Sequence, residues 1–475
     1  MERKTVQFVA AYVVGWFLAS NVWTKEANLA LKTSFLARDS NATSICPPTC
    51  KKMLDTCLSC PDVTENDVNN QTSSNTYRSQ PYQPNTFAED TSNRWIYYRD
   101  NFIYDRINTG PKIGINARIR TEIERVKWKA KKILQQSGVA TAKLKYVDLY
   151  VKYDPFVGKT YLANLEQKTV KGNFQTGSTI VEFNSPFVTG KPKLIDITLE
   201  DSSKHMVIVS TVYEATARLE RFLQRFEANV LKRDPSISNT LRIQFVFFDA
   251  DRQLNTTRKV ISRFREKNAK TVVDFHVING RFNKTFGLHD ATMKCHDDEI
   301  VLYMDIDMFI TSDFLNRIKR NVVKNSTVMF PIPFSQYDPE IMNGASRVFP
   351  LLQTRDKEQI SKQSGFWIYY GFGISAMYKS DYTKIGGFIS SRTGWGGEDV
   401  DFYKKVLADP DLTVMSAVDP DLIHVFHPRR CDIALPSDQL RMCFGAWADG
   451  IGSQMNLAAL LLRQNNSAYE NFDIG

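Results

Sequence analysis

The second half of the chain alternates short apolar runs with amphipathic segments. The apolar runs are four stretches of strand length, at residues 206–210, 243–248, 271–278 and 300–304. The segment after the first run has apolar residues at helical spacing, namely Leu219, Phe222, Leu223, Phe226 and Val230. Strands that alternate with helices predict an α/β fold with a largely parallel sheet, in which ligands bind beyond the carboxyl ends of the strands.

Weaker patterns precede this region. Residues 116–140 are basic and predict a helix, and residues 141–200 contain alternating runs such as 178–183, which predict strands. Residues 24–115 are rich in Asn, Ser, Thr, Asp and Pro, a composition that buries little and is typical of a flexible stem. Residues 116–204 suggest no function, and we treat them as an accessory segment.

An apolar run at residues 6–23 follows Arg3 and Lys4 near the N-terminus. A span of about 20 residues crosses an ordinary bilayer, and thinner membranes accept slightly fewer. Positive charge on the short N-terminal side predicts that the rest of the chain lies in the lumen. A cleaved signal peptide is the alternative. We favour an uncleaved anchor because no clear small-x-small cleavage site follows the run.

These patterns divide the chain into five segments. In order they are a cytoplasmic tail, a transmembrane signal anchor, a lumenal stem, the accessory segment and a lumenal α/β domain, at residues 1–5, 6–23, 24–115, 116–204 and 205–475. Of the 475 residues, 43% are hydrophobic and 12% are aromatic, enough for a substantial core. That composition excludes a disordered protein.

The net charge of +9 narrows the choice of partners only slightly. No basic block or nucleic-acid motif accompanies it, so we expect no nucleic-acid partner. The Lys and Arg residues are scattered along the sequence, which suits a protein that handles anionic ligands.

Sequons and cysteines both fit a lumenal location. Six Asn-x-Ser/Thr sequons occur, at Asn41, Asn70, Asn255, Asn283, Asn325 and Asn465. Four of the seven cysteines cluster near the anchor, at Cys46, Cys50, Cys57 and Cys60. A zinc site or disulfides would explain this cluster, and an oxidising lumen favours disulfides. Cys431 and Cys443 are candidates for a local bridge that would leave Cys295 as the odd thiol, although sequence alone does not fix the pairing.

The first candidate for chemistry is the pair Asp305 and Asp307, which follows the apolar run 300–304. Residues two apart in a strand point to the same face, so we expect the two carboxylates to project together. Such a pair can hold Mg²⁺ or Mn²⁺, which in turn can bridge a diphosphate. The ordinary structural explanation is that polar residues often end strands.

The second candidate is the segment that runs from Gly394 through Trp395 to Glu398, Asp399 and Asp401. A glycine-rich turn enters an amphipathic helix whose first turn is acidic. Acids complement the helix dipole, which explains their presence without a function. That explanation does not require three glycines around a tryptophan, whereas glycines permit close approach of a ligand and an indole face suits a sugar ring.

The third candidate is the pair His424 and His427, two of only six histidines in the chain. A lone histidine is usually structural. Two in a His-x-x-His segment downstream of a carboxylate pair are better candidates for completing a metal site. His424 also follows an apolar Leu-Ile pair, as expected at the end of a strand.

Together these motifs resemble the chondroitin N-acetylgalactosaminyltransferases and the related β1,4-galactosyltransferases, over roughly residues 205–462. Asp305-Ile-Asp307 resembles the metal-binding Asp-x-Asp of that family. Residues 365–373 resemble its glycine segment along the donor sugar, and residues 386–399 its acceptor and catalytic segment. Residues 424–431, followed by Arg441-Met-Cys443, favour the chondroitin branch.

The resemblance implies roles for the matching residues. Asp307 and His424 would ligate the metal, with Asp305 against the metal and the nucleotide-sugar and His427 as a neighbour. Asp399 would be the catalytic base, and Glu398 beside it would contact the acceptor. The implied contacts to the nucleotide-sugar are Arg218, Phe282, Lys284, Asp305, Gly371, Gly373 and Trp395.

The sequence departs from the family at the phosphate-binding segment. The family usually has Arg in place of Lys284, and often Lys in place of Phe286. Lysine still neutralises phosphate but lacks the bidentate fork of arginine, which leaves donor affinity and donor choice open.

The function that the resemblance implies is inverting sugar transfer by a GT-A-like domain with a divalent metal, Mn²⁺. The implied donor is UDP-GalNAc, and the implied acceptor is a glucuronate-ended glycan of chondroitin synthesis. The expected location is the Golgi membrane, in type II orientation with the catalytic domain in the lumen. Two alternatives stay open: a hexosyltransferase that uses UDP-Gal or UDP-GlcNAc, and a non-catalytic partner of a chondroitin polymerase. Assembly with itself or with other glycosaminoglycan transferases is also open.

Overall fold

The computed structural model describes residues 94–108, 110–138, 144–154, 158–167, 178–186, 193–199, 204–348, 360–388, 396–429 and 431–464. Every described residue belongs to one compact unit, Tyr77–Gly475. The expected anchor, the cysteine cluster 46–60 and Trp395 lie outside the described residues. Within the described part, no helix is long and apolar enough to span a membrane.

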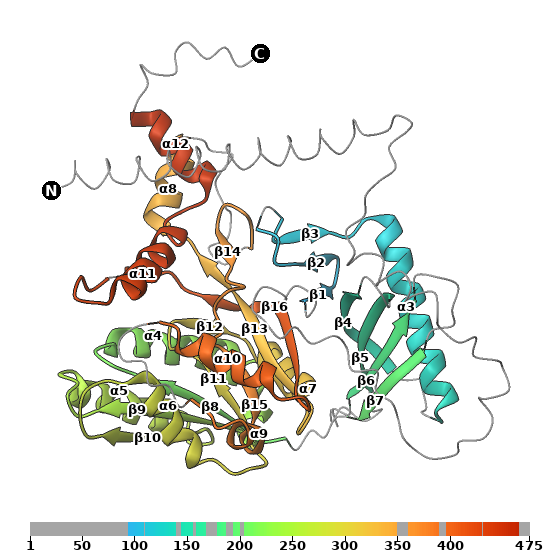
Figure 1. The fold of residues 1–475 in the computed structure, drawn as a ribbon, viewed down its shortest axis with the longest axis horizontal. Helices are drawn as coiled ribbons and strands as arrows, with labels where there is room; N and C mark the ends of the chain where they lie inside the picture. The colour runs from blue at the N-terminus through green and yellow to red at the C-terminus, as the bar shows by residue number, and fades with distance from the viewer. Residues whose placement is uncertain are drawn as a thin grey trace, which may run out of the picture. The chain divides into compact units, whose positions relative to one another are not determined.

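One mixed sheet organises the described part of the chain, with strand order β10-β9-β8-β11-β15-β13-β16-β1-β4-β5-β6-β7 (Figure 1). Its strands are β1 (Arg94–Arg99), β2 (Phe102–Tyr104), β3 (Lys112–Gly114), β4 (Leu144–Asp154), β5 (Gly158–Gln167), β6 (Ser178–Ser185), β7 (Lys193–Leu199), β8 (Met206–Thr211), β9 (Leu241–Phe248), β10 (Val272–Ile278), β11 (Ile300–Tyr303), β12 (Met308–Ile310), β13 (Thr327–Gln336), β14 (Gly365–Trp367), β15 (Ser375–Tyr378) and β16 (Thr413–His424).

The helices follow the strands in sequence. They are α3 (Ala117–Gln136), α4 (Thr216–Phe226), α5 (Leu254–Lys267), α6 (Lys284–Met293), α7 (Ser312–Asn321), α8 (Pro339–Val348), α9 (Lys379–Lys384), α10 (Glu398–Ala408), α11 (Ser437–Asp449) and α12 (Gln454–Gln464). Two short irregular helices, Glu227–Leu231 and Pro235–Asn239, connect α4 to β9.

The expected α/β fold is confirmed, but the sheet is parallel only in part. The four predicted apolar runs form β8, β9, β10 and β11, which pair in parallel. The next strand, β15, runs antiparallel to β11. Strands β4 to β7 also pair antiparallel to one another, because they follow each other through short connections that cannot carry the chain back to the start of a parallel strand.

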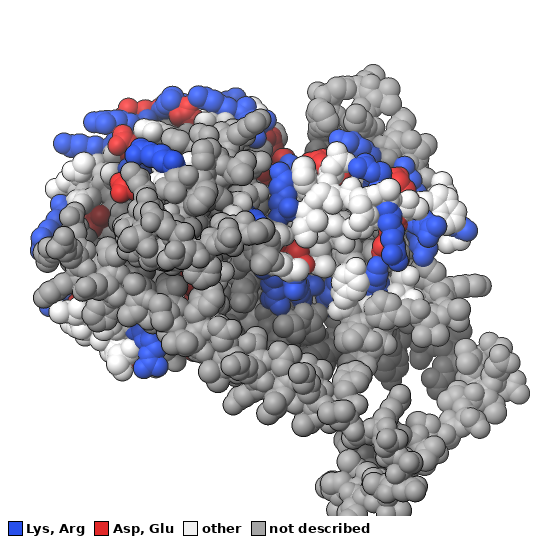
Figure 2. Space-filling view, turned by 90° about the horizontal axis from the view of Figure 1, so that it is seen from above, with Lys and Arg blue, Asp and Glu red and all other residues white. Residues whose placement is uncertain are grey.

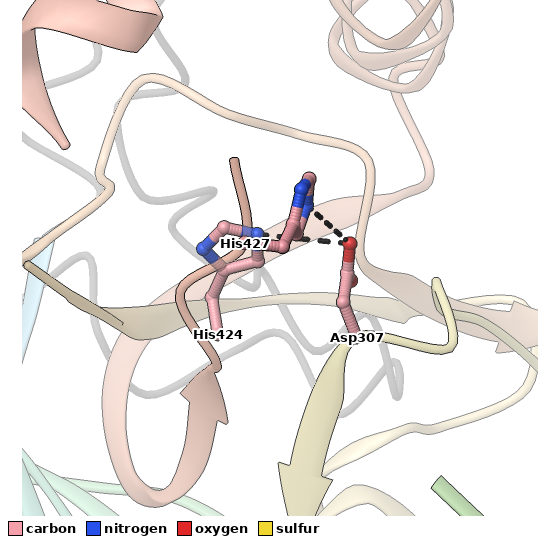
Figure 3. Close-up of side chains that lie close together, drawn as sticks. All are labelled: Asp307, His424 and His427. Atoms are coloured by element: carbon pink, nitrogen blue, oxygen red, sulfur yellow. Dashed lines mark ion pairs between the residues drawn. The ribbon is translucent and has the colours of Figure 1, made fainter. Parts of the chain in front are cut away.

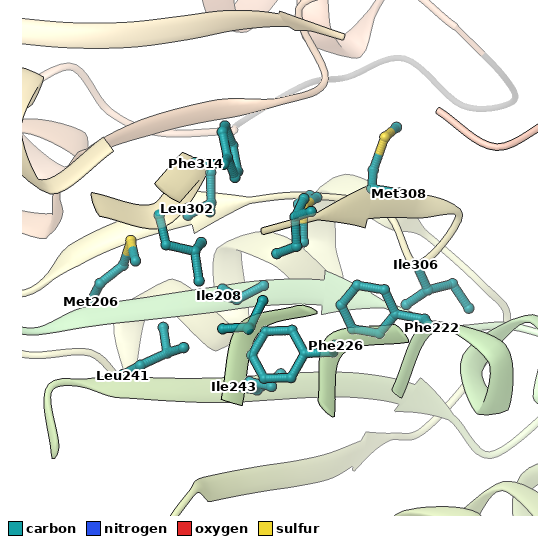
Figure 4. Close-up of a cluster of buried hydrophobic side chains, with 14 of the residues drawn as sticks. Met206, Ile208, Phe222, Phe226, Leu241, Ile243, Leu302, Ile306, Met308 and Phe314 are labelled. Atoms are coloured by element: carbon teal, nitrogen blue, oxygen red, sulfur yellow. The ribbon is translucent and has the colours of Figure 1, made fainter. Parts of the chain in front are cut away.

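Alternating side chains of the parallel strands build two apolar layers. One face of β8, β9 and β11 packs against α4, where Phe222 and Phe226 cover Ile208, Ile243 and Leu302 (Figure 4). The opposite face, which includes Val209 and Tyr303, packs against Phe402 and Tyr403 of α10. Because both faces are covered, the strands read as continuous apolar runs, which is why they could be predicted.

Residues 94–114 form β1, β2 and β3, although their position in a polar region places them in the expected stem. The run Arg-Trp-Ile-Tyr-Tyr-Arg at 94–99 is rich in strand-forming aromatic residues, and Trp95 and Tyr97 are buried. Strand β1 pairs in parallel with β16 and antiparallel with β4. It thereby joins the accessory strands to the rest of the sheet.

Candidate active site

A cavity of about 620 Å³ opens beyond the carboxyl end of β11. Its walls come from segments far apart in the sequence: α6, the β11–β12 turn, β13, the glycine segment after β14, α10, the residues after β16, and α11. Most of the residues predicted from the sequence line it, namely Lys284, Asp305, Asp307, Gly371, Gly373, Glu398, Asp399, His424 and His427. The cavity is therefore the candidate site.

Asp307, His424 and His427 form a compact cluster in the lining of this cavity (Figure 3). Their candidate ligand atoms all lie within 4.8 Å of one another. The Nε2 atom of His427 is 2.9 Å from Asp307 Oδ2, and that of His424 is 3.8 Å away. One carboxylate and two imidazoles are a ligand set that suits divalent transition metals.

The outer ring nitrogens of the two histidines are already engaged. Nδ1 of His424 lies 2.9 Å from the Ser335 hydroxyl, and Nδ1 of His427 lies 3.3 Å from the carbonyl of Pro428. Such partners fix ring orientation and direct Nε2 inward, as is usual for metal-ligating histidines. Asp307 Oδ1 is buried and has no hydrogen-bond partner in the described part of the chain. The residues thus fit a divalent cation.

The electrostatics of Asp307 agree with this arrangement. Burial favours the neutral acid, but hydrogen bonds and charge from His424 and His427 outweigh it and hold the pKa of Asp307 well below its usual range. Arg218 of α4 adds a cation 3.9 Å from Asp307 Oδ2. Asp307 is therefore ionised at neutral pH and ready to ligate a metal.

Asp305 does not join the cluster. The sequence analysis expected Asp305 and Asp307 on one face of a strand, and this was wrong. Strand β11 ends at Tyr303, so both aspartates lie in the turn before β12. Asp305 Oδ2 instead accepts a 2.9 Å hydrogen bond from the Lys284 ammonium. The two aspartates consequently line the same cavity with different partners.

Helix α10 places two further acids at the cavity through its first turn. Gly396 and Gly397 before it have φ angles of 88° and 90°, a left-handed conformation that favours glycine, which explains this part of the motif. Asp399 accepts hydrogen bonds from the backbone N–H of Phe372, at 3.0 Å, and of Val400, at 2.9 Å. Two backbone donors thus hold the Asp399 carboxylate in one orientation.

Glu398 is in a different environment. Burial raises the pKa of Glu398, and Asp399 and Asp305 raise it further, while Lys284 opposes them. Burial lowers the pKa of Lys284, but Asp305, Glu398 and Asp399 outweigh it and raise that pKa above its usual value. Lys284 therefore stays cationic between three carboxylates.

Phe282, unlike most of the predicted residues, lies outside the lining of the cavity. It is half exposed, and its ring lies 5.1 Å from that of Tyr213 and 5.3 Å from that of Phe248. Trp395 lies outside the described residues.

Helix α11 and the segment before it form a wall that the sequence analysis did not predict. Arg429, Met442 and Trp447 line the cavity, and Tyr370 opposite them donates a 2.7 Å hydrogen bond to Asp449. A disulfide between Cys431 and Cys443 ties this wall together, as the sequence suggested, and Cys295 is a buried free thiol. Arg429 was within reach of sequence reasoning, because it stands two residues after the end of the His-x-x-His segment. Ser335, inside an apolar strand, gave no signal.

Comparisons with known proteins agree with the motifs. The sequence model of the family described as chondroitin N-acetylgalactosaminyltransferase matches residues 50–457. Chondroitin sulfate synthase 3 of Homo sapiens is 34% identical over 247 residues, which are 52% of this chain and 27% of that protein. Chondroitin sulfate N-acetylgalactosaminyltransferase 2 of Homo sapiens is 30% identical over 280 residues, 59% of this chain and 49% of that protein.

The chain therefore belongs to the chondroitin N-acetylgalactosaminyltransferase family, as its motifs predicted. The matched region spans about a quarter to a half of the length of these two relatives. Among solved structures, the mannosyltransferase PcManGT from Pyrobaculum calidifontis in complex with GDP-Man and Mn²⁺ aligns with a TM-score of 0.33 and 16% identity, over 58% of this chain and 78% of that one. So low a score carries no argument about function.

Proposed function

We propose that this chain is a metal-dependent, inverting glycosyltransferase with a GT-A-like fold. It moves GalNAc from UDP-GalNAc to a glucuronate-ended glycan in glycosaminoglycan synthesis. Membership of the family supports the reaction class and the donor sugar. Support for a metal comes from the cluster of Asp307, His424 and His427.

The observation that carries the proposal is that one cavity holds both halves of a transfer site. The cluster at Asp307 suits a metal-bound diphosphate, and the acids Glu398 and Asp399 face the same space. A protein that only bound glycans would not need a carboxylate–imidazole cluster beside a pair of carboxylates. A transferase needs both, because it must hold the leaving group and deprotonate the acceptor.

In the proposed reaction, a divalent metal held by Asp307, His424 and His427 would neutralise the diphosphate and so favour departure of UDP. Lys284 and Arg218 add positive charge nearby, since Lys284 lies within ion-pair distance of Asp305 and Arg218 within ion-pair distance of Asp307. Asp399 takes the proton of the acceptor hydroxyl as that oxygen attacks the anomeric carbon. Its two backbone hydrogen bonds keep the carboxylate aimed during the transfer.

A donor panel tests the proposal. The purified chain is incubated with Mn²⁺, a glucuronate-ended acceptor and UDP-GalNAc, UDP-Gal or UDP-GlcNAc in turn, and the anomeric configuration of the product is determined. We expect GalNAc transfer with inversion. Faster transfer from another donor would show a different hexosyltransferase, and no transfer from any donor would favour a non-catalytic partner of a polymerase.

Removal of the metal tests the second part of the proposal. Chelation should abolish transfer, and Mn²⁺ should restore it best because the ligand set mixes oxygen with imidazole. Activity that persists in excess chelator would contradict a metal-dependent mechanism, whatever the donor.

We also propose that the chain is a type II protein of the Golgi membrane, anchored by residues 6–23. The support is the apolar run that follows Arg3 and Lys4. In intact microsomes the chain beyond this run should resist added protease until detergent is supplied. Complete digestion without detergent would contradict the lumenal location.

A further inference from the structure

Helix α3 of the accessory segment carries a concentration of positive charge, within the region 116–140 that the sequence analysis described as basic. Helix α3 has seven basic and two acidic residues, a net charge of +5, whereas the whole chain has +9. More than half of the excess positive charge therefore lies on one helix. Figure 2 shows Lys and Arg side chains on its right-hand part, the side on which Figure 1 places α3, and others along its upper left edge.

The charge is also sorted by face. Ile123, Val126, Ala130 and Leu134 are buried and pack α3 onto the accessory strands. At 100° per residue, the opposite face carries Arg118, Arg125, Trp128, Lys129 and Lys132, which we call the basic stripe. Its cations at positions 118, 125 and 132 follow one another at intervals of about 10 Å along the helix axis.

The two acids of α3 leave most of this stripe without a counter-charge, since only Arg118 interacts with one of them, Glu122. Glu122 accepts hydrogen bonds from Lys159 and Tyr161 of β5, and Glu124 pairs with Lys127. In the part of the chain that the structure describes, no carboxylate lies within ion-pair distance of Arg125, Lys129 or Lys132. These cations are consequently available to an anionic partner.

The exposed indole of Trp128 distinguishes the basic stripe from an ordinary solvated helix face. Its side chain is 61% exposed, in the middle of the stripe, and the Lys132 ammonium lies 5.0 Å from its ring. Solvation needs charged residues but not an exposed indole, which gains nothing from water. An aromatic ring flanked by cations does suit the apolar face of a sugar ring that carries a carboxylate.

We infer that the basic stripe of α3 is a docking site for the acceptor polymer, a uronate-bearing polysaccharide, outside the cavity. The inference rests on the proposed function only for the identity of that polymer. A polysaccharide that bears a carboxylate in every repeating unit presents its charges at regular intervals, as Arg118, Arg125 and Lys132 do along the helix. The stripe would raise the affinity for long acceptors by holding a part of the chain distant from the end that reacts.

The test compares two charge-matched variants of the full-length chain. The stripe variant is Arg125→Gln with Lys132→Gln, and the control is Arg258→Gln with Arg263→Gln, two exposed arginines of α5. Both variants lose the same net charge. The measurements are the Kd for immobilised unsulfated chondroitin at several salt concentrations, and the KM for a long and for a short glucuronate-ended acceptor.

In the stripe variant, the Kd and the KM for the long polymer should each rise roughly three- to tenfold, as expected for two exposed ionic contacts. The KM for the short acceptor should not change, and the salt dependence of polymer binding should weaken. Trp128→Ala should weaken polymer binding without any change in charge. Equal polymer binding by the stripe variant and the control would overturn the inference.

Two further outcomes separate the possible errors. Binding of the stripe to phosphatidylserine-containing vesicles, with no effect of the stripe variant on polymer binding, would overturn the inference in favour of a membrane surface. Absence of transfer to either acceptor by the wild-type chain, with polymer binding that still depends on the stripe, would refute the proposed function and leave the docking site standing.

Discussion

At the scale of single residues, the carboxylates of the cavity differ in what each one contacts. Asp307 faces two imidazoles and keeps one buried oxygen without a hydrogen bond, Asp305 pairs with Lys284, and Asp399 accepts two backbone N–H groups. The partners that surround a carboxylate decide whether it ligates, bridges or accepts a proton. The division of roles is therefore testable one residue at a time.

Asp399→Asn removes the proposed proton acceptor with almost no change in volume. Side-chain general-base catalysis contributes on the order of 10²–10⁴-fold, so turnover should fall at least that far. UDP affinity should persist, because the diphosphate contacts belong to Asp307, Lys284 and their neighbours. If Asp399 only complements the helix dipole, the change should cost about 0.3–1 kcal/mol of stability and leave turnover nearly intact.

The control for this variant is Asp401→Asn, which alters an acid in the same first turn of α10 that does not line the cavity. Turnover, melting temperature and UDP affinity are measured side by side for both variants. Equal turnover in the two would remove Asp399 from the mechanism and make Glu398 the acid to test next.

Ser335→Ala tests whether the histidine cluster binds metal. The Ser335 hydroxyl is the partner of His424 Nδ1, so its loss should free the ring to rotate and weaken metal affinity by about 10–100-fold. Titration with Mn²⁺ by calorimetry measures this directly, without activity. Ser238→Ala, at a half-buried serine that contacts Thr271, is the matched control. Unchanged Mn²⁺ affinity in Ser335→Ala would mean that the metal binds elsewhere.

At the scale of elements, the strands and helices with one dominant pattern could be predicted. Strands β8, β9 and β11 are covered on both faces and therefore read as apolar runs, and the apolar spacing of α4 directly marks its buried side. Strand β1 could not be predicted, because its six residues are too short a run to stand out at the end of a long polar region. The turn between β11 and β12 could not be predicted either, since apolar residues continue through Ile306 and Met308 on both sides of the aspartates.

The residues of the candidate site could be predicted from the sequence where reactive side chains stand together in short motifs. Asp307, His424 and His427 and the acids at the α10 N-terminus stand in short motifs, so residue type and spacing revealed them. Ser335 and the α11 wall act through tertiary position alone. Nothing local distinguishes Trp447 or Met442 from the residues of any amphipathic helix.

The packing of α7 against β16 depends on a buried ion pair. The Arg317 guanidinium donates hydrogen bonds of 2.8 and 2.6 Å to Asp419 and one of 2.5 Å to Asp421, and its side chain is 2% exposed. Arg317→Met would leave Asp419 buried without its partner, which should lower the free energy of unfolding by about 3–5 kcal/mol. Chemical denaturation measures the loss.

Arg99→Met is the control, since Arg99 contacts Asp421 and Asp313 with a side chain that is 26% exposed. Its loss should cost about 1 kcal/mol or less. If the two variants unfold at the same denaturant concentration, the buried pair contributes no more to stability than a surface pair.

At the scale of the whole molecule, the accessory strands and the strands that carry the site belong to one sheet. Strand β1 lies between β16 and β4, and Trp95 and Tyr97 pack in one apolar cluster with Phe334, Trp367 and Met415. A segment that starts at residue 205 therefore lacks β1, the strand that pairs with its own strand β16. A domain boundary between residues 204 and 205 agrees with the change in sequence pattern, but it would leave the edge of β16 without its hydrogen-bonded partner β1.

A truncation series tests this dependence. A chain that starts at residue 91 keeps β1 and should be soluble, with a single cooperative melting transition. A chain that starts at residue 204 loses β1, exposes the edge of β16 and uncovers the cluster around Trp367 and Met415, so it should aggregate. It also loses Arg99, one of the two arginines that neutralise Asp421.

Soluble yield and light scattering, measured on both chains under the same conditions, decide between the two outcomes. A monomeric, cooperatively folded chain from residue 204 would show that the accessory strands are dispensable for folding. The accessory strands would then serve to support helix α3 and its basic stripe.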